Sequence, residues 1–456
     1  MDVKITLDEK SIPSEWYNIV PDLPFDLPPA TSPRTGYPIG PHDLEDLFPQ
    51  ALIEQELDTK RRTVRIPDAV RETYRLWRPT PLFRAERFEK MLGTPAQIFF
   101  KYEGASPSGS HELNTAVAQA YYCREGKMRR MVSGTAAGEW GIALAMACKF
   151  FGIKCKVYMA RAGFDQKPYG RVMMDLWGAE VIPSPSSHTK PGQRALSNNP
   201  GTPGSLGLAI SEAVWEAMSD AETKYALGTV MNHVLLHQTV IGLEAKKQMA
   251  RAEAQPDIVI GCVGGGSNFA GLSFPFMQDQ LKKPRMRFIA VEPAAAPSLT
   301  AGKYAYDYPD ADGLLPVLKM HTLGHDFVPA HIRAGAMRYH GMSPLVSALY
   351  DQKIIEAVAY SQAAVLEAAI QFAHCEGIVP SPESAYAVKA VVEQALACKA
   401  ANEKKTILFA LNAHGYFDLG AYESYLAGKL EEIGSPAEQI NSALNKLPTL
   451  QTQSRN

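Results

Sequence analysis

Short apolar runs alternate with helix-length amphipathic or apolar segments along most of the chain from residue 78 onward. A strand covered on both faces reads as a continuous apolar run, whereas a helix repeats its apolar positions every three to four residues, so this alternation predicts a parallel sheet covered by helices. The runs that predict strands lie at 96–103, 129–134, 154–160, 179–184, 256–263, 286–293 and 405–411. The segments that predict helices lie at 112–125, 138–152, 168–177, 206–220, 241–254, 267–277, 356–375, 383–399 and 419–429.

Three segments lack such a pattern. The first 78 residues are rich in proline, as in "PDLPFDLPPATSPRTGYPIGP", which excludes long helices and central strands and predicts an arm that wraps over a neighbouring surface. Residues 184–205 are rich in Ser, Asn, Gly and Pro and read as a loop. Residues 294–350 also read as irregular, and this length makes them a candidate for active-site cover or partner contact.

Composition narrows the class of protein. The chain has 456 residues, 46% of them hydrophobic and 21% charged, which is enough for a sizeable core and for two or more domains. A formal net charge of -2 gives no electrostatic reason to expect nucleic acid or an anionic membrane as a partner. We find neither a signal-peptide pattern nor about twenty uninterrupted apolar residues, and the six cysteines are scattered. These features predict a cytoplasmic protein that acts on a small molecule.

The clearest local motif is "IVIGCVGGGSN", an apolar strand that ends in Gly264, Gly265 and Gly266, followed by Ser267 and Asn268 at the start of a helix. Glycines let the backbone approach an anion, and the free amides of a helix start together with a hydroxyl complete a phosphate cup. A tight connection between a strand and a helix also needs glycine, so a purely structural role for this turn stays open. The motif has neither the lysine of a P-loop nor the G-x-G-x-x-G spacing, which disfavours nucleotides.

A second strand-to-helix turn lies in "VSGTAAGEWGIALA", and its amides could bind a carboxylate. Thr135, Ala136, Gly138 and Trp140 are therefore candidate substrate contacts. Glu139 lies in the first helical turn, where the helix dipole also favours an acid, so capping and catalysis are both open. The sequence predicts no metal site: the histidines of "NHVLLHQTVIG" have helical spacing, yet a third ligand is not evident and a structural role is favoured.

Many further motifs occur in a fixed order between about residues 75 and 430, and together they resemble the tryptophan synthase β chain, most closely its second, longer subgroup. These motifs are "RPTPL", "KYEG", "PSGSH", "NTAVAQAYY", "GEWGIALA", "QKPYGR", "WGAEVIPSPS", "PGSLGLAISEAV", "NHVLLHQTVIGLEA", "GCVGGGSNFAGL", "VEP", "RYHG", "EGIVPSPES" and "HGYFD".

The resemblance implies a fold-type II pyridoxal-phosphate architecture, α/β, with two three-layer domains of mostly parallel sheets and the cofactor between them, usually in a homodimer. We accordingly expect a Pro-rich N-terminal arm at 1–78, an N-terminal α/β domain with a mobile substrate-loop subdomain at 79–230, and a C-terminal α/β domain with the phosphate cup at 231–456.

Residues carried over from the family match at the phosphate cup and differ elsewhere. The cup is kept, with Ser110 and His111 in the supporting positions, and His111 also faces the expected substrate. The family's Schiff-base lysine follows the histidine of "GSHK", and Glu112 stands there in this sequence. The family's catalytic glutamate, in a "TETGAGQ" loop, aligns with Gly134, and the serine near the pyridine nitrogen aligns with Asn412.

In the same loop the family's glutamine aligns with Glu139, so a carboxyl group replaces the side-chain amide. A carboxylate can move protons but cannot form the covalent link to the cofactor. Lys101 and Lys167 match family positions other than the Schiff base, and no lysine is adjacent to Glu112 in the sequence. We therefore expect that pyridoxal phosphate is bound non-covalently or is absent.

Four functions follow as alternatives. The leading hypothesis is a lyase or synthase of specialised metabolism in which Glu112 and Glu139, with pKa values raised by burial and mutual repulsion, act on an indole or tryptophan-like amine, for example in imine formation and ring closure of the Pictet–Spengler type. The second is tryptophan synthase-type β-replacement, indole plus serine, with non-covalent pyridoxal phosphate. The third is a non-catalytic pseudoenzyme or binding partner. In the fourth, Glu112 is a structural acid paired with a nearby arginine or lysine in a collapsed, empty site.

Overall fold

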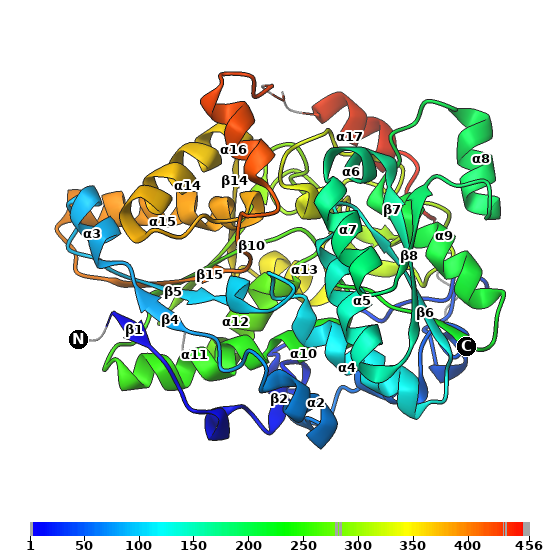
Figure 1. Cartoon of the computed structure of the whole chain (residues 1–456), viewed down its shortest axis with the longest axis horizontal. Helices are drawn as coiled ribbons and strands as arrows, with labels where there is room; N and C mark the ends of the chain where they lie inside the picture. Colours follow the sequence, from blue (N-terminus) through cyan, green and yellow to red (C-terminus); the bar gives the residue numbers. More distant parts are fainter. Residues whose placement is uncertain (1–2, 279–280, 282–284, 432, 434–435, 450–456) are drawn as a thin grey trace.

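The structure is a computed structural model that describes residues 3–278, 281, 285–431, 433 and 436–449. Two sheets organise the chain (Figure 1). The larger sheet has seven strands in the order β1 (Lys4–Ile5), β4 (Leu82–Arg84), β5 (Gln97–Tyr102), β15 (Thr406–Leu411), β10 (Ile258–Cys262), β11 (Arg287–Pro293) and β14 (Glu356–Tyr360). The smaller sheet has four strands in the order β8 (Glu180–Ser184), β7 (Lys154–Ala160), β6 (Arg130–Thr135) and β9 (Thr223–Tyr225).

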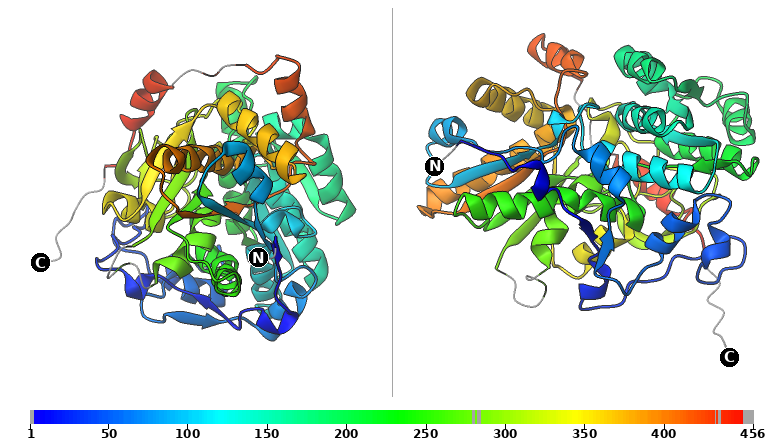
Figure 2. Two further views of the ribbon diagram at one scale, coloured as in Figure 1. Left: turned by 90° about the vertical axis from the view of Figure 1, so that its left-hand side faces the viewer. Right: turned by 60° about the horizontal axis from the view of Figure 1, so that its bottom comes forward.

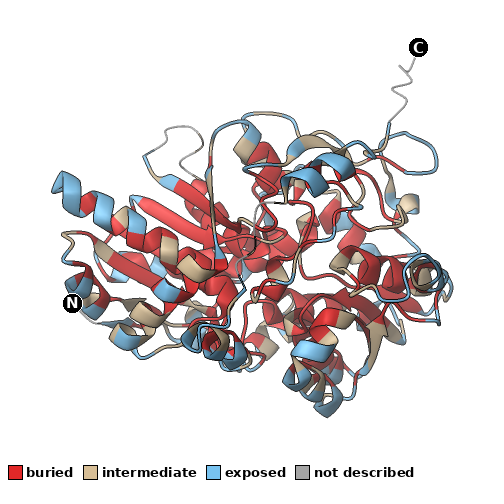
Figure 3. Cartoon of the chain, turned by 90° about the horizontal axis from the view of Figure 1, so that it is seen from above, coloured by how far each residue is buried: buried red, intermediate tan, exposed pale blue. Residues whose placement is uncertain are grey.

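Both sheets are mainly parallel, as the apolar runs predict. The five strands from β5 to β14 pair in parallel, and the smaller sheet is parallel throughout. Antiparallel pairing occurs where β4 meets β1 and β5 at the edge of the larger sheet. Ladder residues of β10 and β15 are buried, because helices cover both faces of the sheet (Figure 3).

Helices lie on the two faces of each sheet (Figure 1). The larger sheet has α14 (Gln362–Glu376) and α15 (Pro382–Ala401), with α3 (Glu86–Leu92), on one side and α10 (Asn232–Gln238), α11 (Val240–Arg251) and α12 (Ser267–Met277) on the other. The smaller sheet packs against α9 (Leu206–Met218), α5 (Glu139–Phe151), α4 (Leu113–Glu125) and α7 (Pro168–Leu176). This is the expected α/β layering.

Where the structure describes the proline-rich segment its elements are short; besides β1 they include β2 (Glu15–Tyr17), β3 (Thr63–Arg65), α1 (Gln50–Glu56) and α2 (Asp68–Tyr74). It runs along one side of the molecule past both sheets (Figure 2). Trp16 is fully buried, and its ring lies 4.4 Å from that of His237, so the arm completes the core beneath α10.

The sheets divide the chain differently from the residue ranges expected for the domains. Strands β4 and β5 fall within 79–230, yet β5 pairs with β15 in the register Ile98↔Ile407 and so belongs to the larger sheet. The smaller sheet draws its strands from 130–225 alone. The mobility expected for a substrate-loop subdomain remains a prediction.

Three expectations about local structure are wrong. The helix expected at 356–375 begins only at Gln362, because β14 pairs with β11 and the Ser361 hydroxyl accepts a hydrogen bond from the Ala364 amide at the helix start. The expected loop at 184–205 contains α8 (Lys190–Asn198), which Thr189 caps. The expected irregular segment at 294–350 contains the hairpin of β12 (Lys303–Asp307) and β13 (Leu318–Thr322) and the helix α13 (Pro344–Asp351), because long-range pairing stabilises a segment that shows no strong local pattern.

Shorter helices complete the chain: α6 (Arg161–Gln166), α16 (Leu419–Leu426) and α17 (Ala437–Leu444). Among the described helices, none combines the length and apolar character needed to cross a bilayer.

Candidate functional site

A cavity lies where the carboxyl ends of β6, β10 and β15 meet, the place where open α/β sheets bind ligands. Residues from both sheets and from α15 line it. Most of the predicted site residues are among them: His111, Glu112, Thr135, Ala136, Glu139, Trp140, Gly264, Gly265, Gly266, Ser267, Asn268 and Asn412. Ser110 and Gly138, also predicted, are adjacent in the sequence to residues of this wall.

The glycine turn after β10 forms a cup at one end of the cavity. Gly266 has φ +103°, a conformation that favours glycine, and α12 begins immediately after it. A Cβ on Gly265 would collide with the side chain of Thr229, and a Cβ on Gly264 would lie 2.8 Å from the carbonyl oxygen of Ala336. A side chain at either position would displace neighbouring atoms, so the close packing of this turn requires glycine.

Three buried polar atoms near the cup have no hydrogen-bond partner among the described residues: Thr229 Oγ1, Asn268 Oδ1 and His111 Nδ1. Buried polar groups in proteins are normally satisfied, so unpaired atoms in a ligand-sized cavity indicate that a ligand completes them. Free helix-start amides at Ser267 and Asn268 add donors suited to a phosphate. These residues fit a phosphate group.

His111 contacts the cup through Ser267, whereas Ser110 contacts Ser106, Glu112 and Ala413. The His111 amide donates to the Asn412 carbonyl oxygen at 2.9 Å, and His111 Nε2 lies 3.2 Å from the Ser267 hydroxyl oxygen. Burial lowers the pKa of His111 to about 4, so the ring is neutral near pH 7. Asn412 follows β15, and its Oδ1 accepts a hydrogen bond from the Ser384 hydroxyl at 2.7 Å.

Glu112 directly precedes α4 at the cavity wall, and its side chain has one weak contact, a 3.5 Å hydrogen bond accepted from the Ser110 hydroxyl. Within the described parts of the chain, no lysine or arginine forms an ion pair with it, which contradicts the expectation of a structural acid paired with a base. Burial, and then the negative charge of Glu383, raise the pKa of Glu112 to about 8. The group can therefore hold or release a proton near neutral pH.

Glu139 begins α5 directly after the turn that follows β6. Its Oε1 is buried and has no hydrogen-bond partner among the described residues. Gly138 has φ +101°, and its amide donates to the Thr135 hydroxyl at 3.2 Å. Trp140 turns its indole nitrogen away to donate to Ser133 Oγ at 2.7 Å, leaving its ring against the cavity.

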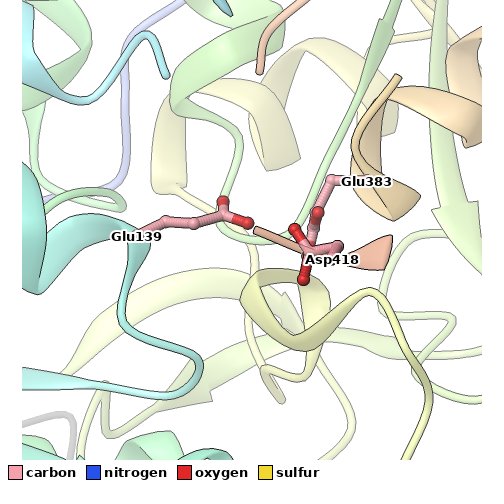
Figure 4. A group of neighbouring side chains, drawn as sticks. All are labelled: Glu139, Glu383 and Asp418. Carbon is pink, nitrogen blue, oxygen red and sulfur yellow. The ribbon is translucent and has the colours of Figure 1, made fainter. Parts of the chain in front are cut away.

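Three carboxylates from distant segments converge at this end of the cavity (Figure 4). Glu139, Glu383 at the start of α15 and Asp418 before α16 each place one oxygen within 4.8 Å of the others. Lys167 Nζ forms an ion pair with Asp418 Oδ1 at 2.5 Å. Burial lowers the pKa of Lys167, but the surrounding carboxylates raise it by more, so the amine is held as an ammonium ion.

In the described chain, these three acidic residues form a cluster whose spacing could hold a metal ion. The Lys167 ammonium already supplies a positive charge there. The sequence reasoning did not select Glu383 or Asp418. A signal was present, since the first lies in "EGIVPSPES" and the second ends "HGYFD". Their proximity to Glu139 depends on the two sheets meeting, which no local pattern reveals.

The other candidates lie outside the cavity. His233 Nδ1 pairs with Glu56 at 2.8 Å, whereas His237 contacts Thr115 and Gln55, so the two histidines serve the packing of the arm. Lys101 is fully buried in a network with the Thr80 carbonyl oxygen, Glu244 and Gln248. Neither histidine nor Lys101 lines the cavity.

Residues 74–412 match the family described as "Pyridoxal-phosphate dependent enzyme". A protein of Aquifex aeolicus named "Tryptophan synthase beta chain 2" is 55% identical over 433 residues, covering 94% of this chain and 100% of that protein. Proteins of the same name from Pyrococcus furiosus and Methanosarcina acetivorans are each 52% identical, over 98% and 94% of this chain and over 100% and 97% of their own lengths.

Two solved structures share the fold at low identity. A threonine deaminase isoform 2 from Solanum lycopersicum superposes with a TM-score of 0.56 at 17% identity, covering 76% of this chain and 82% of that one. A fungal L-serine ammonia-lyase from Rhizomucor miehei gives 0.55 at 15% identity, over 77% and 98% of the two chains. These confirm the expected fold class.

The relatives overturn the leading hypothesis about function. Imine formation and Pictet–Spengler-type cyclisation in specialised metabolism is wrong as the main expectation, because relatives more than half identical over almost the whole chain are tryptophan synthase β chains by name. By its identity, its coverage and the glycine cup at its cavity, the chain belongs to the tryptophan synthase β chain family of pyridoxal-phosphate-dependent enzymes.

Proposed function

We propose that the protein catalyses tryptophan synthase-type β-replacement, joining indole to serine, with pyridoxal phosphate held without a covalent bond to the chain. The observation that carries the proposal is that one cavity contains the glycine cup, the carboxyl group of Glu112 and the turn before Glu139. Relatives at 52–55% identity support this chemistry over the alternatives.

The cofactor's phosphate suits the cup formed by Gly264 to Asn268, where helix-start amides, the Ser267 hydroxyl and the neutral His111 ring offer donors. Asn412 at the end of β15 is the proposed neighbour of the cofactor ring, because it is fixed by Ser384 and lines the same cavity. When bound, pyridoxal phosphate supplies an electron sink for the bonds at the amino acid's α-carbon.

The cavity wall supports non-covalent binding, since none of its described residues is a lysine. Glu112 is the proposed general acid and base of the reaction. Its carboxyl group is buried, weakly bonded and half-ionised near pH 8, so it can accept or return a proton with little driving force in either direction.

The indole would occupy the apolar part of the wall. This part is lined by Trp140, Leu206, Ile210, Tyr225, Leu227, Met337 and Tyr339. Such a surface excludes water and strengthens electrostatic contacts inside the cavity. The serine carboxylate would contact the turn of Thr135, Ala136 and Gly138 at the start of α5.

The test supplies purified protein with pyridoxal phosphate, L-serine and indole and measures tryptophan by chromatography. We expect tryptophan to form in wild type and to fall by about 10²- to 10⁴-fold in Glu112→Gln, which keeps the shape but cannot carry the proton. Glu423→Gln, on an exposed face, is the matched control. Absence of tryptophan with a bound cofactor would refute the proposal and favour a binding partner without activity.

A homodimer and a cytoplasmic location remain proposals that rest on the family resemblance and on composition. Sedimentation of the purified chain with and without pyridoxal phosphate measures the first. A single-chain mass under both conditions would contradict it.

A further inference from the structure

An acid stands where the turn before α5 would receive a substrate carboxylate. Glu139 lies in the first turn of α5, lines the cavity and leaves Oε1 without a partner among the described residues. If Glu139 were ionised, its charge would oppose the carboxylate of any amino acid at this turn. The first-turn amides attract an anion, so the two effects conflict at one place.

The charges around Glu139 do not permit full ionisation. Glu383 and Asp418 each place an oxygen within 4.8 Å of one of its oxygens, and the negative charge of Glu112 in the same cavity acts on it as well. Lys167, which pairs with Asp418, supplies the compensating positive charge. Carboxylates this close together and largely removed from water, with one ammonium ion paired to Asp418, share protons, because adjacent like charges there cannot all persist.

The available proton falls to Glu139 or to Glu383. Asp418 accepts the Lys167 ion pair, which favours its charged form. Glu383 Oε2 and Glu139 Oε1 both lack a hydrogen-bond partner among the described residues. Glu383 nevertheless accepts one hydrogen bond, from the Ala336 amide to its Oε1 at 3.2 Å, whereas no described residue donates to the Glu139 carboxyl group. A carboxylate oxygen without donors is the better place for a proton.

We propose that Glu139 controls binding of the substrate carboxylate through its own protonation: as a neutral acid it donates a hydrogen bond to the carboxylate, and as an anion it repels it. This rests on the proposed function only for the identity of the substrate, an α-amino acid. Glu139 is thus a specificity-determining residue whose ionisation gives the site a pH limit.

The direction with pH follows from the environment. Burial first, and then Glu383, raise the pKa of Glu139, with a smaller opposing effect of Lys167 and further contributions from Asp418 and Glu112. Below that raised pKa the side chain is neutral and the carboxylate is bound. Above it, affinity for a carboxylate falls by about tenfold per pH unit, the limit for one proton released.

The experiment compares two ligands that differ only at the carboxylate. Indole-3-propionate carries the charge, and indole-3-propionamide has the same shape without it. Both lack an amine, so neither titrates between about pH 6 and pH 10. Calorimetric titration of the protein without cofactor gives the two dissociation constants at each pH. The quantity compared is the dissociation constant of the propionate divided by that of the propionamide. Any effect of pH on the protein as a whole cancels in this ratio.

Three variants separate a proton on Glu139 from a structural effect. In Glu139→Gln most of the rise should be lost, and only the smaller contribution of Glu112, which lines the same cavity and has a pKa of about 8, should remain. In Glu383→Gln the neighbouring charge is removed, so the rise in the ratio should begin at a lower pH than in wild type. In Lys167→Met the compensating charge is removed, so the rise should begin at a higher pH.

The ratio should rise with pH in wild type, and most of that rise should be lost in Glu139→Gln. A flat ratio in wild type, the same rise in Glu139→Gln, or failure of the propionate to bind at any pH would overturn the proposal. Loss of the rise on adding EDTA would also overturn it, since a metal ion would then be the titrating partner. Because the readout is binding, the result is independent of whether tryptophan is formed.

Discussion

The buried, unpaired carboxyl group of Glu112 should make the protein less stable as the pH rises, and Glu112→Gln should remove that loss. Burial and the neighbouring Glu383 raise its pKa from 4.5 to about 8 in the folded chain. An acid whose pKa is raised on folding favours the folded state most at low pH, and this advantage is lost as the pH rises through the folded pKa.

The size of the effect follows from the same shift. Each pKa unit corresponds to about 1.4 kcal/mol, so above pH 8 the ionised Glu112 costs on the order of 3 kcal/mol of folding free energy, with about 4–5 kcal/mol as the upper limit. Glutamine at this position keeps the volume and the contact with Ser110 while removing the charge. We therefore expect Glu112→Gln to be more stable than wild type by this amount at pH 9 and nearly equal to it at pH 5.

Urea unfolding without cofactor, at about pH 5 and pH 9, measures the difference in the free energy of unfolding. Glu423→Gln, at an exposed position, should change it by no more than about 0.5 kcal/mol at either pH. An equal effect of Glu112→Gln at both pH values, or a loss of stability at pH 9, would refute the description of Glu112 as a buried carboxyl group without a cationic partner.

Three further predictions concern the cofactor site and the core. Glu112→Lys places an amine in the cavity wall, so borohydride reduction with pyridoxal phosphate should leave a pyridoxyl adduct on residue 112 by mass spectrometry; labelling of wild type to the same extent would contradict the account. Gly265→Ala brings a Cβ against Thr229 in the cup and should weaken pyridoxal phosphate binding by about tenfold or more in a fluorescence titration, and unchanged affinity would exclude this cup as the phosphate site. Arg78→Met leaves the fully buried Glu103 and Glu244 without the guanidinium that pairs with both, and should lower the free energy of unfolding by about 3–5 kcal/mol. A loss below about 1 kcal/mol would show that these ion pairs are not buried in solution.

The larger elements could be read from the sequence because their patterns are local. The strands at 154–160 and 286–293 and the helix at 267–277 lie within about a residue of the positions that their apolar runs predict. Strand β14 could not be read in this way, because "EAVAY" carries too few bulky residues and becomes a strand by pairing with β11. The helix α8 likewise depends on its Thr189 cap.

In the candidate site, too, the part formed by one contiguous motif could be predicted from the sequence, and the part assembled from distant segments could not. The cup of Gly264 to Asn268 is a contiguous motif, and its chemistry follows from glycine and a helix start. The cluster of Glu139, Glu383 and Asp418 is not contiguous: Glu139 is more than two hundred residues from the other two in the sequence, and it meets them only because two sheets pack together. The function first inferred was wrong because one residue, Glu112, was given more weight than the framework around it.

The most direct test of the central claim is whether tryptophan formation from indole and L-serine depends reversibly on pyridoxal phosphate. We predict that dialysis abolishes activity, that added cofactor restores it with saturation, and that the protein mass is unchanged throughout. Activity that survives exhaustive dialysis together with a covalent increase in mass, or no tryptophan at any cofactor concentration, would contradict the account.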